Sequence, residues 1–205
     1  MSDKKYVVTI TRQFGSMGRP IAMKMSKLLG IEFYDRDLVD QAAEKLNLPA
    51  SVVDENEERA KHVAANAYYR MAFPLGRQNT TDKQDKIFEA QKNIIKFLAE
   101  KESCIIVGRC ADFILEDMDN VVNIYVYADY EDRLLHCTNE LGMNEKEGRR
   151  MISTVDEARK AYHLNYAGYL PGDINYMDIV INSGFLGVDG TAEFLAAAIK
   201  KKFCL

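Results

Sequence analysis

Five short runs of apolar and β-branched residues stand out along the chain. They cover residues 6–12, 31–35, 103–109, 121–128 and 178–183. Most of these runs are nearly continuous in apolar residues rather than alternating with polar ones. Strands with this pattern are covered on both faces, so the runs predict a parallel sheet of five strands.

Helical patterns separate the predicted strands. The segment GRPIAMKMSKLLG predicts a helix that begins near Gly18 and ends at Gly30, with Pro20 in the first turn, where a missing N–H is harmless. A second helix is expected over residues 87–100. Its predicted buried face consists of Ile87, Ala90, Ile94 and Phe97.

Capping signals mark further helices in the second half of the chain. Asp129 and Gly142 are expected to delimit one, the NEKE segment at residues 144–147 resembles a capping box that opens another, and residues 189–202 supply a last helix with C-terminal lysines. Alternating strands and helices favour a doubly wound α/β domain with right-handed crossovers.

The alternation breaks once, between the second and third strands. Residues 36–85 are polar, charged and largely helix-like, with a loop-like stretch at residues 76–85. We interpret them as a helical lobe inserted into a single domain that spans residues 1–205.

The composition indicates which kinds of binding partner the protein is expected to have. The chain has 205 residues, 47% hydrophobic and 28% charged, and a net charge of −4 from 27 basic and 31 acidic residues that are interspersed. Without a basic stripe we expect no nucleic-acid partner, and without a long apolar run no membrane span. The polar N-terminus carries no signal segment, so we expect a cytoplasmic protein. The four cysteines lack metal-ligand spacing and are expected to be reduced thiols. The oligomeric state is left open.

Charged clusters follow the predicted strands at their carboxyl ends, where ligands bind in an open parallel sheet. These clusters cover residues 12–19, 35–37, 108–112 and 129–133. Arginine recurs in them, and guanidinium groups near a helix N-terminus suit a phosphate.

The first cluster can be compared with the phosphate-binding loop pattern GxxxxGK[ST]. Gly18 and Arg19 fall on its second glycine and its lysine, whereas Gln13 and Pro20 replace its first glycine and its hydroxyl residue. The pattern itself therefore fails. Taken alone, the segment fits either a variant phosphate loop or an ordinary turn between a strand and a helix.

Six segments in order resemble one known family over nearly the whole chain. They are TRQFGSMGRPIA, LGIEFYDRDLV, AEKESCIIVGRCADFIL, VYADYEDR, VDEARKAYHLNYAG and YMDIVINSGFLG. This combination is similar to the cytidylate-kinase-like family of P-loop nucleoside monophosphate kinases. The resemblance implies the P-loop kinase type of sheet, an inserted helical lobe and a helical lid at residues 144–170.

The resemblance gives the first loop a role in binding the donor phosphates. Gly15, Ser16, Met17, Gly18 and Arg19 would cradle them, although Met17 stands where another glycine is expected. Arg19 would also supply catalytic charge. Two roles fit Ser16: a ligand of magnesium, or a turn residue that bonds its own backbone.

The resemblance also assigns an acceptor site. Asp35 is followed here by Arg36, unlike in cytidylate kinases, and capping a helix is its alternative role. Arg109 would contact the acceptor phosphate, and Asp112 would face the same ligand or pair with Arg109. The implied acceptor-binding set is Asp35, Arg109, Asp112, Arg133 and Asp156.

In the predicted lid, Arg150 and Arg159 are the implied catalytic arginines, with a solvated helix face as the alternative for Arg150. The tyrosines at positions 162, 166, 169 and 176 fit packing better than a stacking platform. No histidine presents itself as a general base, which phosphoryl transfer does not require.

The implied activity is transfer of the terminal phosphoryl group of ATP, with Mg²⁺, to a small acceptor, for which the resemblance favours CMP or dCMP. Two alternatives stay open: a nucleotide-binding protein without kinase activity, and a kinase of the same fold whose acceptor is not a nucleotide.

Overall fold

A computed structural model of the protein describes residues 5–35 and 81–205. The predicted helical lobe therefore lies outside the described residues, apart from its last five. These five open helix α4 (Thr81–Lys101), so the end of the stretch predicted to be loop-like is helical. Helix α4 begins six residues earlier than the helix expected from residue 87.

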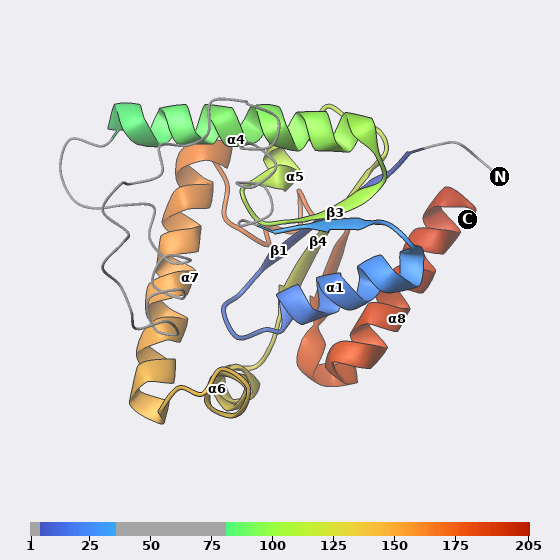
Figure 1. Ribbon diagram of the computed structural model, residues 1–205. Coiled ribbons are helices and arrows are strands. Elements are labelled where there is room, and N and C mark those ends of the chain that lie inside the picture. Colours follow the sequence, from blue (N-terminus) through green and yellow to red (C-terminus); the bar gives the residue numbers. More distant parts are fainter. Residues whose placement is uncertain (1–4, 36–80) are drawn as a thin grey trace, which may run out of the picture.

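The described part of the chain forms a five-stranded, all-parallel sheet with the order β2-β3-β1-β4-β5, as the strand pattern predicted. In Figure 1 the sheet lies between two layers of helices. The strands are β1 (Val7–Arg12), β2 (Glu32–Tyr34), β3 (Cys104–Val107), β4 (Val121–Tyr127) and β5 (Ile179–Asn182).

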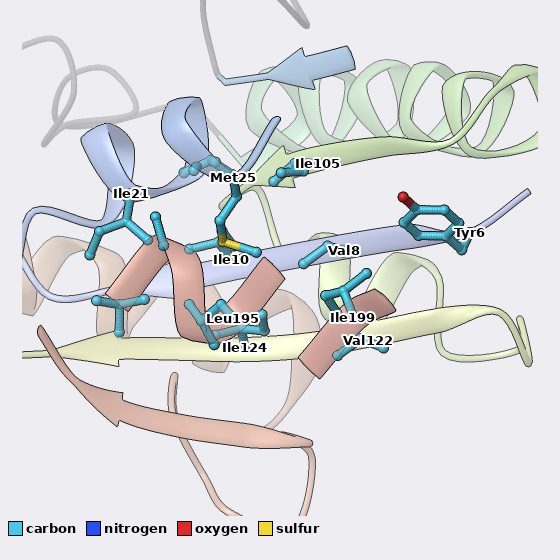
Figure 2. Packing of buried hydrophobic residues seen from close by; sticks show 14 residues of the cluster. Tyr6, Val8, Ile10, Ile21, Met25, Ile105, Val122, Ile124, Leu195 and Ile199 are labelled. Atoms are coloured by element: carbon cyan, nitrogen blue, oxygen red, sulfur yellow. The ribbon is translucent and has the colours of Figure 1, made fainter. Parts of the chain in front are cut away.

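Helices α1 (Gly18–Leu29) and α8 (Ser183–Phe203) cover one face of the sheet. Figure 2 shows Val8 and Ile10 of β1 packed against Ile21 and Met25 of α1 and against Leu195 of α8, all fully buried. This apolar layer fixes α1 on the central strand, and with α1 the loop that precedes it.

Helix α4 and the short helix α5 (Ala111–Ile114) cover the other face. The predicted buried face of α4 is partly wrong, because Ile94 is buried but Phe97 is 41% exposed. The buried stripe runs instead through Phe88, Gln91, Ile95 and Leu98. Packing against a second partner accounts for the rotation, since the ring of Phe88 stacks on Tyr166 of helix α7 at 4.0 Å.

Helices α6 (Tyr130–Asn139) and α7 (Glu145–Ala167) form a third cluster with the loop after β1. Phe14 from that loop packs among Leu134, Met151 and Val155. Phe14 follows the carboxyl end of β1, so its contact with α7 places this long helix beside the carboxyl ends of the central strands.

The helix ends follow the predicted signals in most places. Helix α1 ends at Gly30 in the left-handed conformation, and the Asn144 side chain accepts a hydrogen bond from the Glu147 N–H at the start of α7. Helix α6, however, ends before Gly142, and Asp129 occupies its N-cap without a side-chain hydrogen bond.

Helix α8 begins at Ser183, but its helical geometry breaks at Gly187, so the helix predicted over residues 189–202 corresponds to the part of α8 after this break. Among the helices that the structure describes, none combines the length and the apolar character that a membrane span needs.

Candidate functional site

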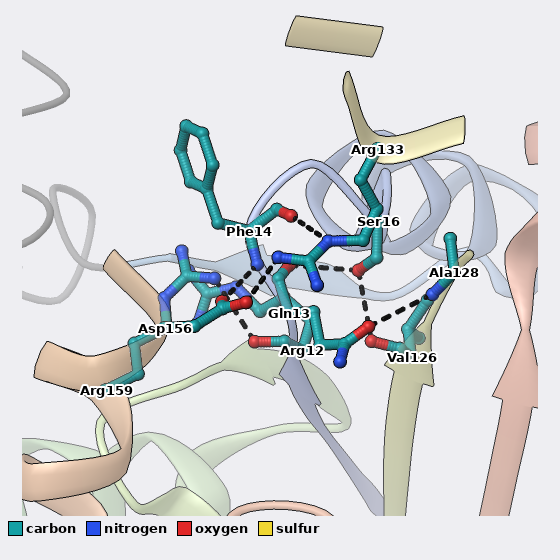
Figure 3. A network of polar contacts seen from close by, with 9 residues as sticks. All are labelled: Arg12, Gln13, Phe14, Ser16, Val126, Ala128, Arg133, Asp156 and Arg159. Carbon is teal, nitrogen blue, oxygen red and sulfur yellow. Dashed lines mark hydrogen bonds and ion pairs between the residues drawn. The ribbon is translucent and has the colours of Figure 1, made fainter. Parts of the chain in front are cut away.

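The loop between β1 and α1 is held by main-chain and side-chain contacts to strand β4. The Gln13 N–H donates to the Val126 carbonyl at 3.1 Å, and the Gln13 side-chain oxygen accepts from the Ala128 N–H at 3.2 Å. Figure 3 shows these contacts at the carboxyl end of β4. The loop is therefore fixed to the strand next to its own.

Ser16 lies inside this loop and is fully buried. Its hydroxyl lies 3.0 Å from the carbonyl oxygen of Gln13 and 3.0 Å from that of Val126, and it donates to these carbonyls. The Ser183 hydroxyl in turn donates to the Ser16 carbonyl at 2.8 Å. This geometry favours the turn role for Ser16 over the predicted role as a magnesium ligand.

Arg133 and Asp156 clamp the same loop from α6 and α7. The Arg133 Nε donates to the Phe14 carbonyl at 2.7 Å, and Asp156 Oδ1 accepts from the Phe14 N–H at 2.7 Å. The two side chains also form an ion pair with each other (Figure 3). Their observed contacts go to the loop backbone, so both side chains hold the loop, whichever part they take in binding an acceptor.

The Arg133 main chain also explains Gly15. Gly15 has φ +78°, and a Cβ at this position would lie 2.8 Å from the Arg133 carbonyl oxygen. Only glycine combines this backbone conformation with this close approach.

Arg159 reaches the start of the loop from α7. Its Nη1 donates to the Arg12 carbonyl at 3.1 Å, and its guanidinium carbon lies 5.9 Å from the centre of the Phe14 ring. Burial lowers the pKa of Arg159 to about 10, with Asp156 opposing that shift. The predicted catalytic arginine thus stands at the loop, partly withdrawn from water.

Arg19 and Asp35, which the resemblance placed in the donor and acceptor sites, are joined to each other. The Arg19 Nε lies 2.6 Å from Asp35 Oδ2, and half of the Arg19 side chain stays exposed. Asp35 itself is buried and directly follows β2, the edge strand of the sheet. Its alternative role as a helix cap concerns a segment outside the described residues. Met17, at the expected glycine position, has φ +60°, a left-handed conformation that glycine adopts without strain.

Arg109 follows β3 in a strained turn. Gly108, Arg109 and Cys110 have φ values of +78°, +60° and +53° in succession. Consecutive non-glycine residues in this region are sparse and cluster at functional sites. Within residues 5–35 and 81–205 the Arg109 side chain makes no hydrogen bond or ion pair.

Asp112 does not pair with Arg109, contrary to one of the two predicted alternatives. It is buried, and its Oδ2 accepts from the Tyr169 hydroxyl at 2.9 Å and lies 2.9 Å from His163 Nε2. His163 Nδ1 lies 2.9 Å from the Tyr169 carbonyl oxygen. Asp112 thus anchors the C-terminal end of α7 to α5. Its Oδ1 has no partner among the described residues.

The tyrosines of this region pack, as the sequence indicated. Tyr169 stacks on Tyr176 at 3.7 Å, and Tyr162 and Tyr166 meet Phe88. Both ring nitrogens of His163 have partners, so this side chain is part of the packing around Asp112.

Arg12 is a functional candidate that the sequence patterns did not single out. It ends β1, beside Arg159, Arg109 and Arg19, and its guanidinium group has no hydrogen bond in the described part of the chain. Burial is the main cause that lowers the pKa of Arg12, and the positive charges of Arg159 and Arg109 lower it further. Its place at the carboxyl end of the central strand was the signal that could have singled it out.

Arg150 lies exposed on α7, and it too makes no hydrogen bond or ion pair in the described segments. Among these same segments, no group of three or more histidine, cysteine, aspartate or glutamate side chains is placed to hold a metal ion. Ser16, the predicted magnesium ligand, is buried, and its hydroxyl bonds the carbonyls of Gln13 and Val126.

The parallel sheet with this strand order and the arginine-surrounded loop after its central strand define an α/β protein of the P-loop kinase type. Residues 7–184 match the cytidylate kinase-like family, and the chain belongs to this family. The family resemblance seen in the sequence is thereby confirmed.

Two relatives illustrate the range of similarity. A cytidylate kinase of Thermoplasma volcanium is 22% identical over 181 residues, which cover 87% of this chain and 83% of the relative. The crystal structure of an uncharacterized protein from Eubacterium ventriosum is 27% identical, with a TM-score of 0.72 over 96% of this chain and 99% of the other.

A shikimate kinase from Bacteroides thetaiotaomicron shares the fold. Its TM-score is 0.52 at 13% identity, over 98% of this chain and 99% of that structure.

Proposed function

We propose that the protein is a kinase that transfers the terminal phosphoryl group of ATP to a small acceptor, a nucleoside monophosphate such as CMP or dCMP. One observation carries the proposal. Arg12, Arg19, Arg109 and Arg159 meet at one end of the sheet, where the nearby carboxylates of Asp35 and Asp156 already have cationic or main-chain partners. Such an excess of positive charge suits the polyanionic substrates of phosphoryl transfer.

We assign the donor phosphates, the acceptor phosphate and the transferred group to different residues of the site. The loop at residues 15–19 and the N-terminus of α1 face the donor phosphates, because main-chain N–H groups and the helix dipole favour an anion there. Arg109, whose guanidinium group has no hydrogen bond or ion pair in the described segments, binds the phosphate of the acceptor. Arg19 and Arg159 neutralise the charge that spreads over the transferred group.

Arg150 has a different place in the proposal. It is exposed and unpartnered in the described structure, so it reaches the substrates only if the segment at residues 144–170 moves as a lid. Closure of this kind excludes water and limits hydrolysis of ATP.

One observation favours a second candidate, a protein that binds nucleotides without transferring phosphate. Ser16 is buried with its hydroxyl bonded to main-chain carbonyls, and Met17 replaces a glycine at a left-handed position. A loop built in this way offers no side chain to position magnesium.

The test is an assay of ADP formation from magnesium-ATP with a panel of nucleoside monophosphates and, as further acceptors, shikimate and simple sugars. We expect ADP formation that depends on CMP or dCMP and that falls at least about 100-fold in Arg19→Ala and Arg109→Ala. Lys201→Gln, which removes an exposed charge at the end of α8, is the control.

The outcomes separate the candidates. Binding of ATP and CMP without acceptor-dependent ADP supports the second candidate. Turnover only with a non-nucleotide acceptor supports a small-molecule kinase. If no nucleotide binds at millimolar concentration, the proposal fails.

A further inference from the structure

Arg12 occupies a slot that two glycines create. A Cβ on Gly18 would lie 2.9 Å from Arg12 Cβ and 3.0 Å from its Cγ, so an alanine there would press on the base of the side chain. A Cβ on Gly108 would lie 2.3 Å from Arg12 Nη1. The Arg12 side chain therefore runs from the start of α1 to the turn after β3, where it meets the backbone next to Arg109.

The sheet register brings Arg12 and Arg109 to the same level. Strands β1 and β3 are parallel neighbours in which Ile10 pairs with Val107, and the Gly108 N–H donates to the Ile10 carbonyl at 3.0 Å. Arg12 and Arg109 each follow their paired residue by two positions. Two guanidinium groups thus leave adjacent strands at one point of the site.

Neither guanidinium group has a hydrogen-bonding partner within residues 5–35 and 81–205. The carboxylate that favours the charge of Arg12 is Asp35, which is already bonded to Arg19. The other charged groups near Arg12 are the cations Arg159, Arg109 and Arg19. A desolvated cation among other cations is unfavourable unless an anion joins it.

We infer that Arg12 and Arg109 together form a clamp for one oxyanion group, the phosphate of the acceptor, and that Arg12 thereby selects acceptors that carry such a group. This inference rests on the proposed function and deepens it. The planar guanidinium fork suits the two-point contact with phosphate that a lysine ammonium does not give. The glycine slot holds the fork in place, so little side-chain freedom remains to be lost on binding.

The clamp also explains why Arg12 stays in a costly position. Without a ligand, Arg12 adds repulsion to the site, so its removal relieves strain in the free protein. A residue kept for structural reasons would have the opposite effect on stability.

The experiment uses the full-length protein and three variants, Arg12→Gln, Arg12→Lys and the control Lys201→Gln. Isothermal titration calorimetry measures the binding of CMP, of uncharged cytidine and of ATP. Thermal unfolding is followed for each protein with and without inorganic phosphate.

We expect Arg12→Gln to weaken CMP binding by roughly 10- to 100-fold and Arg12→Lys by a smaller factor, because charge-assisted contacts are lost or reduced. Cytidine and ATP binding should change less than about threefold. Without ligand, Arg12→Gln should unfold at the same or a higher temperature than the natural protein, and it should lose the stabilisation by phosphate.

Three results would overturn the inference. Equal loss of ATP and CMP affinity places Arg12 at the donor. If CMP affinity is unchanged in Arg12→Gln but is lost in Arg109→Ala, the proposed function holds and the clamp is rejected. If the natural protein binds no nucleotide, the proposed function fails. The clamp is then tested separately: it is rejected if inorganic phosphate stabilises Arg12→Gln as much as it stabilises the natural protein.

Discussion

The carboxylate of Asp156 accepts a hydrogen bond from the Phe14 N–H at 2.7 Å, which joins residues that lie 142 positions apart in the sequence. The same carboxylate pairs with Arg133, whose Nε donates to the Phe14 carbonyl. The two side chains thus occupy both polar groups of the Phe14 main chain. A loop that has little secondary structure of its own is thereby held from α6 and α7.

Removal of the Asp156 carboxylate should therefore destabilise the whole protein. The variant Asp156→Ala leaves the buried Arg133 without its counter-charge and the Phe14 N–H without its acceptor. We expect the free energy of unfolding in urea to fall by about 2–3 kcal/mol, less than for a fully buried pair because the Asp156 side chain is 27% exposed.

The neighbouring Glu157→Ala is the matched control for this experiment. Its carboxylate is 72% exposed and lies 3.9 Å from Lys160, so its loss should change the free energy of unfolding by less than about 0.5 kcal/mol. If Asp156→Ala keeps its stability and instead only raises the KM for the acceptor, Asp156 is an acceptor ligand rather than a support of the loop.

Ser16→Ala tests the two roles of the loop hydroxyl. Because the hydroxyl is buried and bonds main-chain carbonyls of Gln13 and Val126, its removal should lower the free energy of unfolding by about 1–2 kcal/mol. The magnesium concentration that gives half-maximal ADP formation should stay unchanged. A raised magnesium requirement with normal stability would instead make Ser16 a metal ligand; the exposed Ser153→Ala serves as control.

Gly15→Ala and Gly30→Ala form a pair that isolates the contact with Arg133. Both glycines have positive φ, but a Cβ on Gly30 meets nothing within 4 Å, whereas one on Gly15 meets the Arg133 carbonyl at 2.8 Å. Gly30→Ala should lower the free energy of unfolding by about 1–2 kcal/mol. Gly15→Ala should lower it by about 1–3 kcal/mol more, because a backbone atom must move. Equal effects in urea denaturation would mean that the loop yields freely.

The stability of the protein should fall with rising pH through His163. Burial acts to lower the pKa of His163, but the hydrogen bond to Asp112 and its charge outweigh burial, so the folded pKa lies above the ordinary 6.5. Both ring nitrogens face oxygen acceptors, which only the imidazolium form satisfies. The stabilisation is complete below about pH 6.5 and is lost as pH rises through the raised pKa.

The measurement is urea denaturation of the natural protein and of His163→Gln at pH values from below 6.5 to above the raised pKa of His163. The free energy of unfolding should fall with rising pH in the natural protein, and this fall should be absent in the variant. His136 gives the control of opposite sign, since burial lowers its pKa and its contribution is therefore lost as pH falls below 6.5. A slope that is the same in His163→Gln would show that other groups cause it.

The sequence determined the strands and most of the helix ends, because these depend on short-range patterns. Runs rich in apolar residues predicted five strands, and the structure confirms all five. Of these five, only β1 and β3 are buried on both faces as the pattern predicted, because β4 alternates between buried and half-buried positions and β2 and β5 are the edge strands. Gly30 and Asn144 ended and began helices as their local chemistry dictates. The six segments in order along the chain also sufficed to identify the family, whereas the loop at residues 12–19 taken alone did not.

Only the tertiary structure decided the partners of the charged side chains. Asp112 bonds His163 and Tyr169 rather than the nearby Arg109, Asp35 takes Arg19, and Arg12 remains without a partner in the described part of the chain. The rotation of the buried face of α4 was likewise set by Phe88 stacking on Tyr166. Apolar periodicity indicates which face of an element is buried against the sheet. An ion pair, however, forms between side chains that come together only when elements distant in the sequence pack. No local sequence pattern therefore predicts it.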